Sequence, residues 1–283
     1  MNTDLWARSI SRPVWERCQV RPFTGRAVTI SPHACNLLSA DGELVVLALP
    51  IVGDGPFNIV VDSEPADMTA ITAGSHARMG RDRLQAGNLS IRLEGAAIWE
   101  PLPNWRGLRA AMAGHPPPSS FLDYAPSDPP GLADATFVVG PALVHLAAGW
   151  AGDATGLAAG AVSLAGLGRG LTPAGDDFLA GVMLAAWLTH PAPQALCDEI
   201  IRAAAPRTSL ISAAFLRAVA RGEISPAWHR LLAALAHGDN DEAAAAVQAV
   251  LAHGATSGAD ALAGFRWASA LPSPAGPDRF SPP

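Results

Sequence analysis

The sequence contains no lysine: its 19 arginine and lysine positions are all arginine. Without a lysine amine the chain cannot form a Schiff base or hold a nucleotide in a Walker-type phosphate loop, because both need that amine. Cysteine is scarce as well. Cys18, Cys35 and Cys197 are scattered and show no C-x-x-C spacing. We therefore expect neither a disulfide framework nor a cysteine zinc site.

Charge and long apolar runs are also limited. Charged residues make up 16% of the chain and the net charge is −6, which excludes an overall positive field for nucleic acid or anionic membrane. The apolar runs are too short or too broken by glycine to fill the roughly 20 residues of a membrane span. The N-terminal stretch has charges throughout and lacks the apolar core of a signal peptide. We expect a cytoplasmic protein with no nucleic-acid or membrane partner.

What is present divides the chain into two halves of different character. The first half carries short segments rich in β-branched and aromatic residues and bounded by turn residues, "RAVTIS", "ELVVLALP", "FNIVVDS" and "LSIRLEGAAIWEP", with "HACNLL" before the second of them. Asp41-Gly42 is a strong hairpin signal between two of them. The second half is rich in alanine and leucine at helical spacing. The pattern predicts an α+β chain, an antiparallel β domain resembling a barrel or sandwich followed by a mainly helical half.

Composition also predicts the boundaries of these parts. The β-rich domain is expected over residues 1–113, a Pro/Ser-rich linker or wrapping loop over 114–131, a helical domain over 132–271 and a disordered tail over 272–283. The helices are expected at about 135–150, 156–165, 173–189, 194–205, 209–221, 226–237, 240–253 and 258–269.

The stretch "GLGRGLTPAGDDFLAG", residues 166–181, places two adjacent aspartates before a wholly apolar run. Thr172 is the expected N-cap, and Pro173 the first helical residue. The helix that follows is apolar all round and so is expected to be buried. Asp176 and Asp177 therefore sit in the first turn of a core helix.

Two interpretations of this pair remain open. First-turn acids gain about 0.3–1 kcal/mol each from the helix dipole, and an arginine can pair with them. Two adjacent carboxylates near a core nevertheless repel each other unless a cation or N–H donors lie between them. The second interpretation is a catalytic, ligand or metal site, with Mg²⁺ as a possible ion. The glycine amides near the pair and the Arg169 cation would then bind an anion; the residues concerned are Gly168, Gly170, Thr172 and Gly175.

Two further helix starts carry similar chemistry. In "HGATSGADALAG", Ser257 and Asp260 have capping-box spacing, and Gly254 is expected to end the preceding helix. Ser257, Gly258 and Asp260 are also candidates for the anion or substrate site. In "PRTSLISAAFLRAVARG", Thr208 or Ser209 is expected to cap a helix on which Ser212 faces inward.

The β half offers weaker candidates. His33 and Asn36 lie beside Cys35 and are each compatible with a structural or a substrate-binding role. We expect the site at the junction of the two halves, where His33 and Asn36 would reach the aspartates. His76 and Arg78 are expected in a solvated loop. No H-E-x-x-H or G-x-S-x-G motif supports zincin or α/β-hydrolase chemistry.

"GLGRGLTPAGDDFLAG" together with "HGATSGAD" resembles a bacterial family that includes the AllH-type subunit of oxamate carbamoyltransferase. The family pattern runs close to G-L-G-P-G-L-T-P-S-G-D-D-F-L-A-G, followed by G-x-[ST]-S-G-x-D. The similarity is most specific over residues 166–264 and looser over 27–62. Arg169 stands where the family usually has proline, and Ala174 where it usually has serine.

The resemblance implies carbamoyl transfer between oxalurate and phosphate, giving oxamate and carbamoyl phosphate. It also implies other subunits, one of them related to acyl-CoA synthetases. For such a substrate, Asp176, Asp177 and Asp260 would bind ureido N–H groups or Mg²⁺, while helix amides bind the anionic end. Two alternatives stay open: a non-catalytic docking subunit of a multi-subunit enzyme, and a stand-alone metal-dependent amide or ureido hydrolase.

Overall fold

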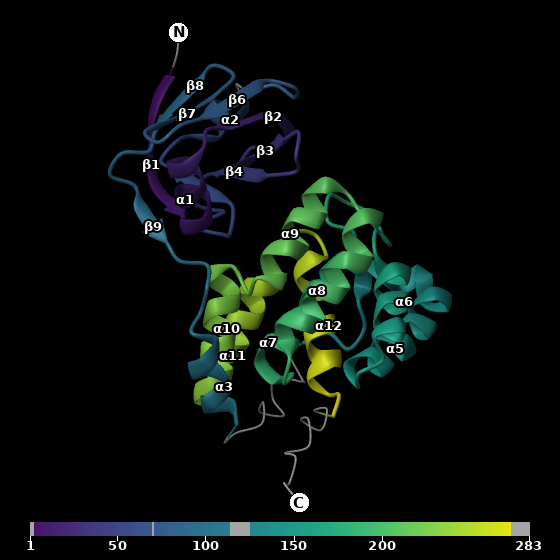
Figure 1. Ribbon diagram of the computed structural model, residues 1–283. Coiled ribbons are helices and arrows are strands. Elements are labelled where there is room, and N and C mark those ends of the chain that lie inside the picture. The colour runs from purple at the N-terminus through teal and green to yellow at the C-terminus, as the bar shows by residue number, and fades with distance from the viewer. Residues whose placement is uncertain (1–2, 70, 114–124, 273–283) are drawn as a thin grey trace, which may run out of the picture. The chain divides into compact units, whose positions relative to one another are not determined.

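The computed structural model describes residues 3–69, 71–113 and 125–272. The chain forms two compact units, Met1–Pro103 with Ile224–Pro226, and Asn104–Glu223 with Ala227–Pro283. The first unit holds the strands and the second unit holds most of the helices (Figure 1). The expected α+β class, with β structure first and helices after, is therefore confirmed.

A ring of eight strands forms the first unit, and β5 pairs with β1 to close it in the order β5-β4-β3-β2-β6-β7-β8-β1. A ninth strand, β9, pairs with the end of β1. The strands are β1 Thr3–Ser11, β2 Phe23–Ile30, β3 Ala34–Ser39, β4 Leu44–Ala48, β5 Asn58–Val61, β6 His76–Met79, β7 Arg83–Ala86, β8 Leu89–Arg92 and β9 Ala97–Trp99. Closure leaves no free edge in the ring, which matches the barrel-like form expected from the sequence.

Most neighbouring strands are antiparallel, as expected, but the sheet is mixed. β1 runs parallel to β8 and β9, and β4 runs parallel to β5. The pairings of β1 with β8 and β9 join segments far apart in the chain, whereas β4 and β5 are joined by a short crossover, and no hairpin turn signal predicts a parallel pair. Two helices, α1 (Arg12–Val20) and α2 (Pro65–Thr69), connect strands of this unit.

The barrel interior is filled by the inward side of each strand. β2 alternates buried and exposed side chains, and β4 is buried along its whole length. The inward side chains form one apolar core with Phe23, Leu37, Leu47, Ile59, Met79, Leu84 and Ile91 among its members. Burial of such a side chain stabilises the fold by about 1.5–3 kcal/mol, so the alternation in sequence sets which face turns inward.

The helical unit begins earlier than the sequence boundary at residue 113. α3 (Trp105–Met112) falls in this unit, and its Trp105 ring stacks on Trp187 of α7 with centroids 5.6 Å apart. The remaining helices are η1 Pro130–Ala135, α5 Thr136–Trp150, α6 Ala154–Leu164, α7 Ala174–Thr189, α8 Pro193–Ala204, η2 Ala205–Arg207, α9 Leu210–Ala220, α10 Pro226–His237, α11 Asn240–Leu251 and α12 Ser257–Ser269. Residues 114–124 of the expected linker and 273–283 of the expected tail lie outside the described residues.

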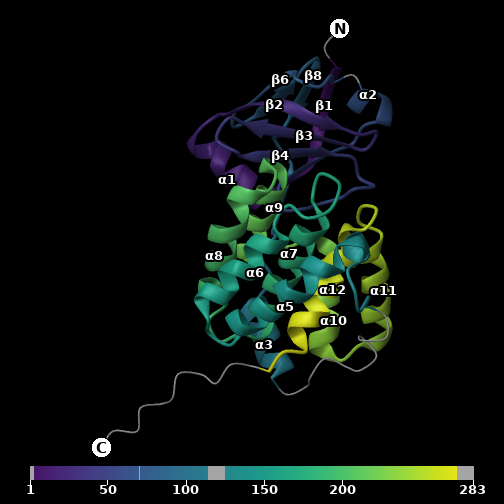
Figure 2. The same ribbon diagram turned by 90° about the vertical axis from the view of Figure 1, so that its right-hand side faces the viewer.

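α7 and α12 lie side by side at the centre of the helical unit (Figures 1 and 2). Twelve of the sixteen α7 residues are buried, as the all-round apolar pattern predicts. Glycine makes the contact possible. A Cβ added at Gly181 would lie 1.9 Å from the Ala261 carbonyl oxygen, and one at Gly264 would lie 2.1 Å from that of Phe178. The two backbones therefore approach more closely than any side chain allows.

α5 is unusually exposed for an apolar helix. Pro130–Trp150 is long and apolar enough to cross a membrane, and 17% of it is buried. Phe137 is 93% exposed and Val144 68% exposed. One helix that satisfies length and composition is weak evidence for a span, so the absence of a membrane partner stays a prediction.

Candidate functional site

A glycine loop leads into α7. Gly166, Gly168 and Gly170 all have positive φ, between +72° and +107°, a backbone region that L side chains rarely adopt. A Cβ at Gly168 would also lie 2.8 Å from the Ala174 nitrogen, so the loop folds back tightly on the helix start. The N-cap is Pro173, not Thr172 as predicted, and α7 begins at Ala174. Thr172 is thereby free to pair its hydroxyl with that of Ser257 on α12, at 3.1 Å.

Asp176 is 1% exposed, and three donors of the protein satisfy its carboxylate. The Gly166 amide donates to Oδ1 at 3.0 Å, while the hydroxyls of Ser212, at 2.7 Å, and Thr208 donate to Oδ2. Ser212 faces inward and Ser209 caps α9, as the sequence indicates. Asp176 thus connects the glycine loop, the start of α7 and the start of α9.

Asp177 points to a different neighbour, because adjacent residues on a helix project about 100° apart. It shares its face with Gly181, one turn further on, which is the point where α7 meets α12. The Oδ2 atom of Asp177 is buried and has no hydrogen-bond partner among the described residues. The groups that act on Asp177 are the hydroxyls of Ser257 and Thr172 and the carboxylate of Asp260 in the first turn of α12.

Asp260 is fully buried in the first turn of α12. Its Oδ1 accepts the Gly131 amide at 2.9 Å, but its Oδ2 has no hydrogen-bond partner in the described part of the chain. A Cβ at Gly131 would lie 2.6 Å from that Oδ2 and 2.5 Å from the Ala174 Cβ, so only glycine fits there. Asp177 and Asp260 are the two acids of the site that each keep a buried, unpartnered oxygen.

Burial raises the pKa of Asp177 to about 7; the hydroxyls of Ser257 and Thr172 oppose the rise, and the charges of Asp260 and Asp176 add to it. Burial likewise raises the pKa of Asp260, against the Gly131 amide and the Thr256 hydroxyl. A buried carboxylate with a pKa near 7 changes protonation around neutral pH, which suits a group that gives and takes protons.

Several amides expected to bind an anion are already engaged. The Gly175 amide donates to the Leu167 carbonyl at 2.8 Å, and the Gly258 amide donates to that of His253 at 3.1 Å. Gly168, Arg169 and Gly170 are exposed in the loop, and the Arg169 side chain has no ionic partner among the described residues. Any anion role in the loop consequently falls to these three residues.

Two of the remaining predicted residues, His33 and Asn36, lie in the barrel unit. His33 is exposed, and the Asn36 side chain on β3 donates to the Thr29 hydroxyl at 2.6 Å. Their expected contact with the aspartates stays a prediction. The capping-box spacing assigned the N-cap position to Ser257. In the structure Thr256 is the N-cap, and Ser257 is the first residue of α12. Gly254 has φ +68° just after α11, as expected for a residue that follows a helix end.

Gly131 was not among the residues singled out from the sequence, and the structure places it against Asp260 and Ala174. Asp176 and Asp177 are adjacent in the chain but face apart, whereas Asp177 and Asp260 each lie four residues before a glycine at the α7–α12 crossing. The chain shows this as a repeated motif, "DFLAG" at 177–181 and "DALAG" at 260–264. Helical spacing of acid and glycine in both segments was the available signal.

No group of three or more His, Cys, Asp or Glu side chains able to hold a metal ion occurs among the described residues. Asp177 and Asp260 with the two hydroxyls offer oxygen donors only. Mg²⁺ accepts one or two carboxylates when substrate oxygens or water complete its shell. The donors are therefore compatible in kind with Mg²⁺, and metal dependence stays a prediction.

Two family models match the chain, one in each half. The family model described as oxamate carbamoyltransferase subunit AllH matches residues 164–269, and the AllH family N-terminal domain matches residues 6–98. The chain belongs to the AllH family. No curated protein and no solved structure gives a significant match.

The two AllH matches follow the structure closely. The N-terminal match contains all nine strands except the first residues of β1 and the last of β9, and the second match runs from the end of α6 to the end of α12. Asp176, Asp177 and Asp260 all fall in the second match. The chain is accordingly a carbamoyltransferase-related subunit, and its family description implies other subunits.

Proposed function

We propose that the start of α7 and the start of α12 hold a small ureido or amide substrate, oxalurate, oxamate or a related metabolite, during carbamoyl transfer. The observation that supports this most is the pair of buried, unpartnered oxygens on Asp177 and Asp260. An unsatisfied buried acceptor costs about 1–3 kcal/mol, so a ligand that donates N–H groups to both would recover that cost.

The chemistry of the site matches the polar half of such a substrate. Ureido and amide nitrogens are donors, and carboxylates accept from them strongly. The hydroxyls of Thr172 and Ser257, 3.1 Å apart, either donate or accept and so fit the substrate carbonyl beside those nitrogens. Asp177 and Asp260 are therefore assigned to substrate binding, with Thr172 and Ser257 orienting the carbonyl.

Asp177 is also assigned the proton step. In carbamoyl transfer from oxalurate, a phosphate oxygen forms a bond to the carbamoyl carbon, and the bond from that carbon to the oxamate nitrogen breaks. The departing nitrogen takes up a proton. A carboxyl with a pKa of about 7 holds that proton near neutral pH and accepts it again in the reverse direction.

The anionic end of the substrate needs a positive partner, because ionised carboxylates repel it. Arg169, exposed in the glycine loop and unpaired within the described residues, is the side chain assigned to this role. Mg²⁺ held by Asp177, Asp260 and a substrate oxygen is the competing arrangement. His33 and Asn36 remain proposed contributors from the barrel unit, and a cytoplasmic location belongs to the same proposal.

Asp176 favours a second candidate function, that of a non-catalytic docking subunit. Its two oxygens are already satisfied by Gly166, Ser212 and Thr208, so it has the contacts of a structural residue rather than of a catalytic one. If Asp177 and Asp260 have the same role, the chain supports chemistry carried out elsewhere in the assembly, with the acyl-CoA-synthetase-related chain as the proposed catalytic partner.

Thermal-shift measurements separate these candidates. Wild type, Asp177→Asn, Asp260→Asn and Asp176→Asn are melted with oxamate, oxalurate, carbamoyl phosphate, phosphate and Mg²⁺, singly and in pairs. Asp241→Asn, an exposed aspartate in the first turn of α11, is the matched control. Ligand at a hundred times its dissociation constant stabilises the native state by about 2.7 kcal/mol, enough to raise Tm measurably.

We expect oxamate or oxalurate to raise the Tm of wild type and Asp241→Asn but not of Asp177→Asn or Asp260→Asn. Asp176→Asn is expected to lower Tm without ligand, since three donors lose their acceptor charge. If Mg²⁺ alone gives the shift, the metal arrangement replaces direct N–H recognition. A folded wild type that responds to none of the probes contradicts the substrate site and favours the docking subunit.

A further inference from the structure

The outer face of the barrel is strongly basic from β2 across β6 and β7 to β8. Five arginines project from it, and we call this set the arginine face: Arg26, Arg78, Arg81, Arg83 and Arg92. Asp4 and Asp82 are the acidic side chains among them. The chain as a whole carries a net charge of −6, so this concentration of positive charge is opposite in sign to the molecule.

Strand register brings these cations together rather than separating them. Arg83 on β7 faces Arg92 on β8, an arrangement of like charges that weakens a sheet. Asp4 on β1 compensates by pairing with both, at 3.0 Å and 3.6 Å. The Arg92 guanidinium also lies over the half-exposed Trp6 ring, 5.1 Å from its centre. The fold thus holds an ordered row of cations at a cost to its own sheet.

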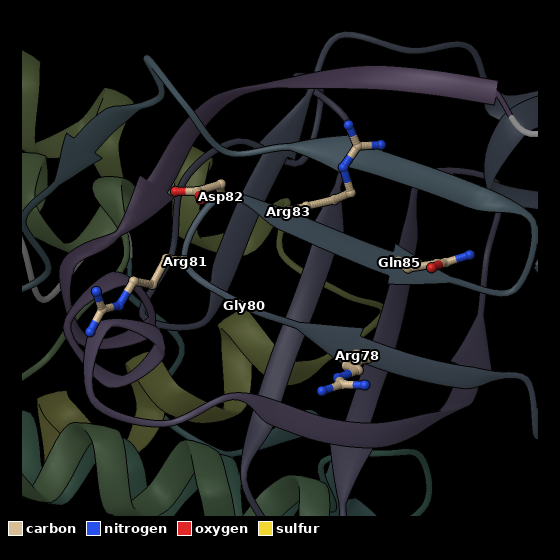
Figure 3. A pocket seen from close by; sticks show the side chains of 6 residues that line it. All are labelled: Arg78, Gly80, Arg81, Asp82, Arg83 and Gln85. Carbon is tan, nitrogen blue, oxygen red and sulfur yellow. The ribbon is translucent and has the colours of Figure 1, made fainter.

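The centre of the face carries no such compensation. Arg78 and Arg81 are exposed and have no ionic partner among the described residues. They line a shallow surface hollow of about 300 Å³ together with Gly80, Asp82, Arg83 and Gln85, so one carboxylate stands among three guanidinium groups. Figure 3 shows that the Arg78, Arg81 and Arg83 side chains point in different directions across the sheet. Small-molecule sites are enclosed, mainly apolar and convergent, and this hollow has none of those properties.

We propose that the arginine face docks an acidic surface of another subunit of the carbamoyltransferase. Arginine and tryptophan are the residues most enriched among those that carry binding energy at protein interfaces. An open, spread-out row of guanidinium groups fits carboxylates distributed over a second protein surface. Complementary charge of this kind mainly accelerates association and selects the partner, and it weakens as salt screens it.

The test measures binding of the full chain to its co-expressed and purified partner subunits by biolayer interferometry at 50 and 200 mM NaCl. The double variant Arg78→Glu/Arg81→Glu is compared with wild type and with Arg106→Glu. Arg106 is an exposed arginine on α3 that also has no ionic partner among the described residues, so its variant controls for a single charge reversal outside the face. Circular dichroism melts confirm that the variants remain folded.

We expect the double variant to weaken binding at least tenfold at 50 mM NaCl and to lose most of the salt dependence, while Arg106→Glu stays within twofold of wild type. Unchanged affinity of the double variant, an equal loss in Arg106→Glu, or no binding by wild type overturns the proposal. Tripolyphosphate serves as a small-anion probe. If it binds wild type and not the double variant while subunit affinity is unchanged, the face is a small-anion site instead.

Discussion

Replacing Asp177 by asparagine should make the protein more stable, by an amount that depends on pH. Burial is the main reason that the pKa of Asp177 rises from an ordinary 3.8 to about 7. At about 1.4 kcal/mol for each tenfold change in proton affinity, ionised Asp177 costs the native state up to roughly 4 kcal/mol. Partial contact with solvent reduces this, so we expect about 2–4 kcal/mol.

The direction follows from proton linkage. Because native Asp177 binds its proton more tightly than the unfolded chain does, its contribution to stability is complete below pH 4. That contribution is lost as pH rises through about 7. Asparagine keeps the shape of the protonated carboxyl and carries no charge at any pH. The free energy of unfolding of Asp177→Asn should therefore equal that of wild type within about 1 kcal/mol at pH 4.5 and exceed it at pH 8.

Urea unfolding followed by circular dichroism at 222 nm measures both free energies at each pH. Asp241→Asn, in the first turn of α11 but exposed, controls for loss of a first-turn charge. Its difference from wild type should change by less than 0.5 kcal/mol, on the order of a surface substitution, between the two pH values. A difference for Asp177→Asn that is equally flat would refute the desolvation argument and, with it, the proton step assigned to this residue.

Two substitutions and one chemical reaction test other parts of the structure. Ser212→Ala removes a 2.7 Å donor from buried Asp176 and should lower the free energy of unfolding by about 1–3 kcal/mol in urea titrations, whereas a neutral effect would mean that Asp176 is not held as described. Gly264→Ala would place a Cβ 2.1 Å from the Phe178 carbonyl, so we expect failure to fold or a loss of at least about 3 kcal/mol by the same measurement; a stable variant would show that the helix crossing is looser. All three thiols are buried, and burial raises the pKa of Cys35 to about 11, so Ellman's reagent should react at pH 8 only after denaturation.

The fold class followed from the sequence because each half carries one dominant period. Strand β6 and the parallel pairings of β1 were not predicted from the sequence. In β6, His76 and Arg78 alternate with buried Ala77 and Met79, so half of the segment is polar and exposed, and it was assigned to a solvated loop. The parallel pairings of β1 depend on residues more than 80 positions away, and a local pattern contains no record of them. Tertiary pairing decided both cases.

The candidate site was predicted in its parts and not in its geometry. Helical spacing already predicts that Asp176 and Asp177 lie on different faces, and in the structure Asp176 reaches α9 while Asp177 lies near Ser257 of α12. In both α7 and α12 a glycine follows the acid by four residues, and this spacing marks where Asp177 and Asp260 lie relative to the helix crossing. The sequence gives no sign that residue 131 must be glycine. Only the packing of Ala174 and Asp260 around it leaves no room for a side chain.

The position of β1 constrains the order in which the barrel is made. This first strand closes the ring, yet β5, β8 and β9, its three partners, all lie later in the chain. During synthesis β1 can pair with β5 once Val61 is available, but its pairing with β8 and β9 waits for residues 89–99, and such long-range closures are slow steps in folding. Trp6 lies on that strand and meets Arg92 only when β1 and β8 pair. In a variant that keeps Trp6 alone of the eight tryptophans, fluorescence would therefore time the closing of the barrel separately from the collapse of the helices.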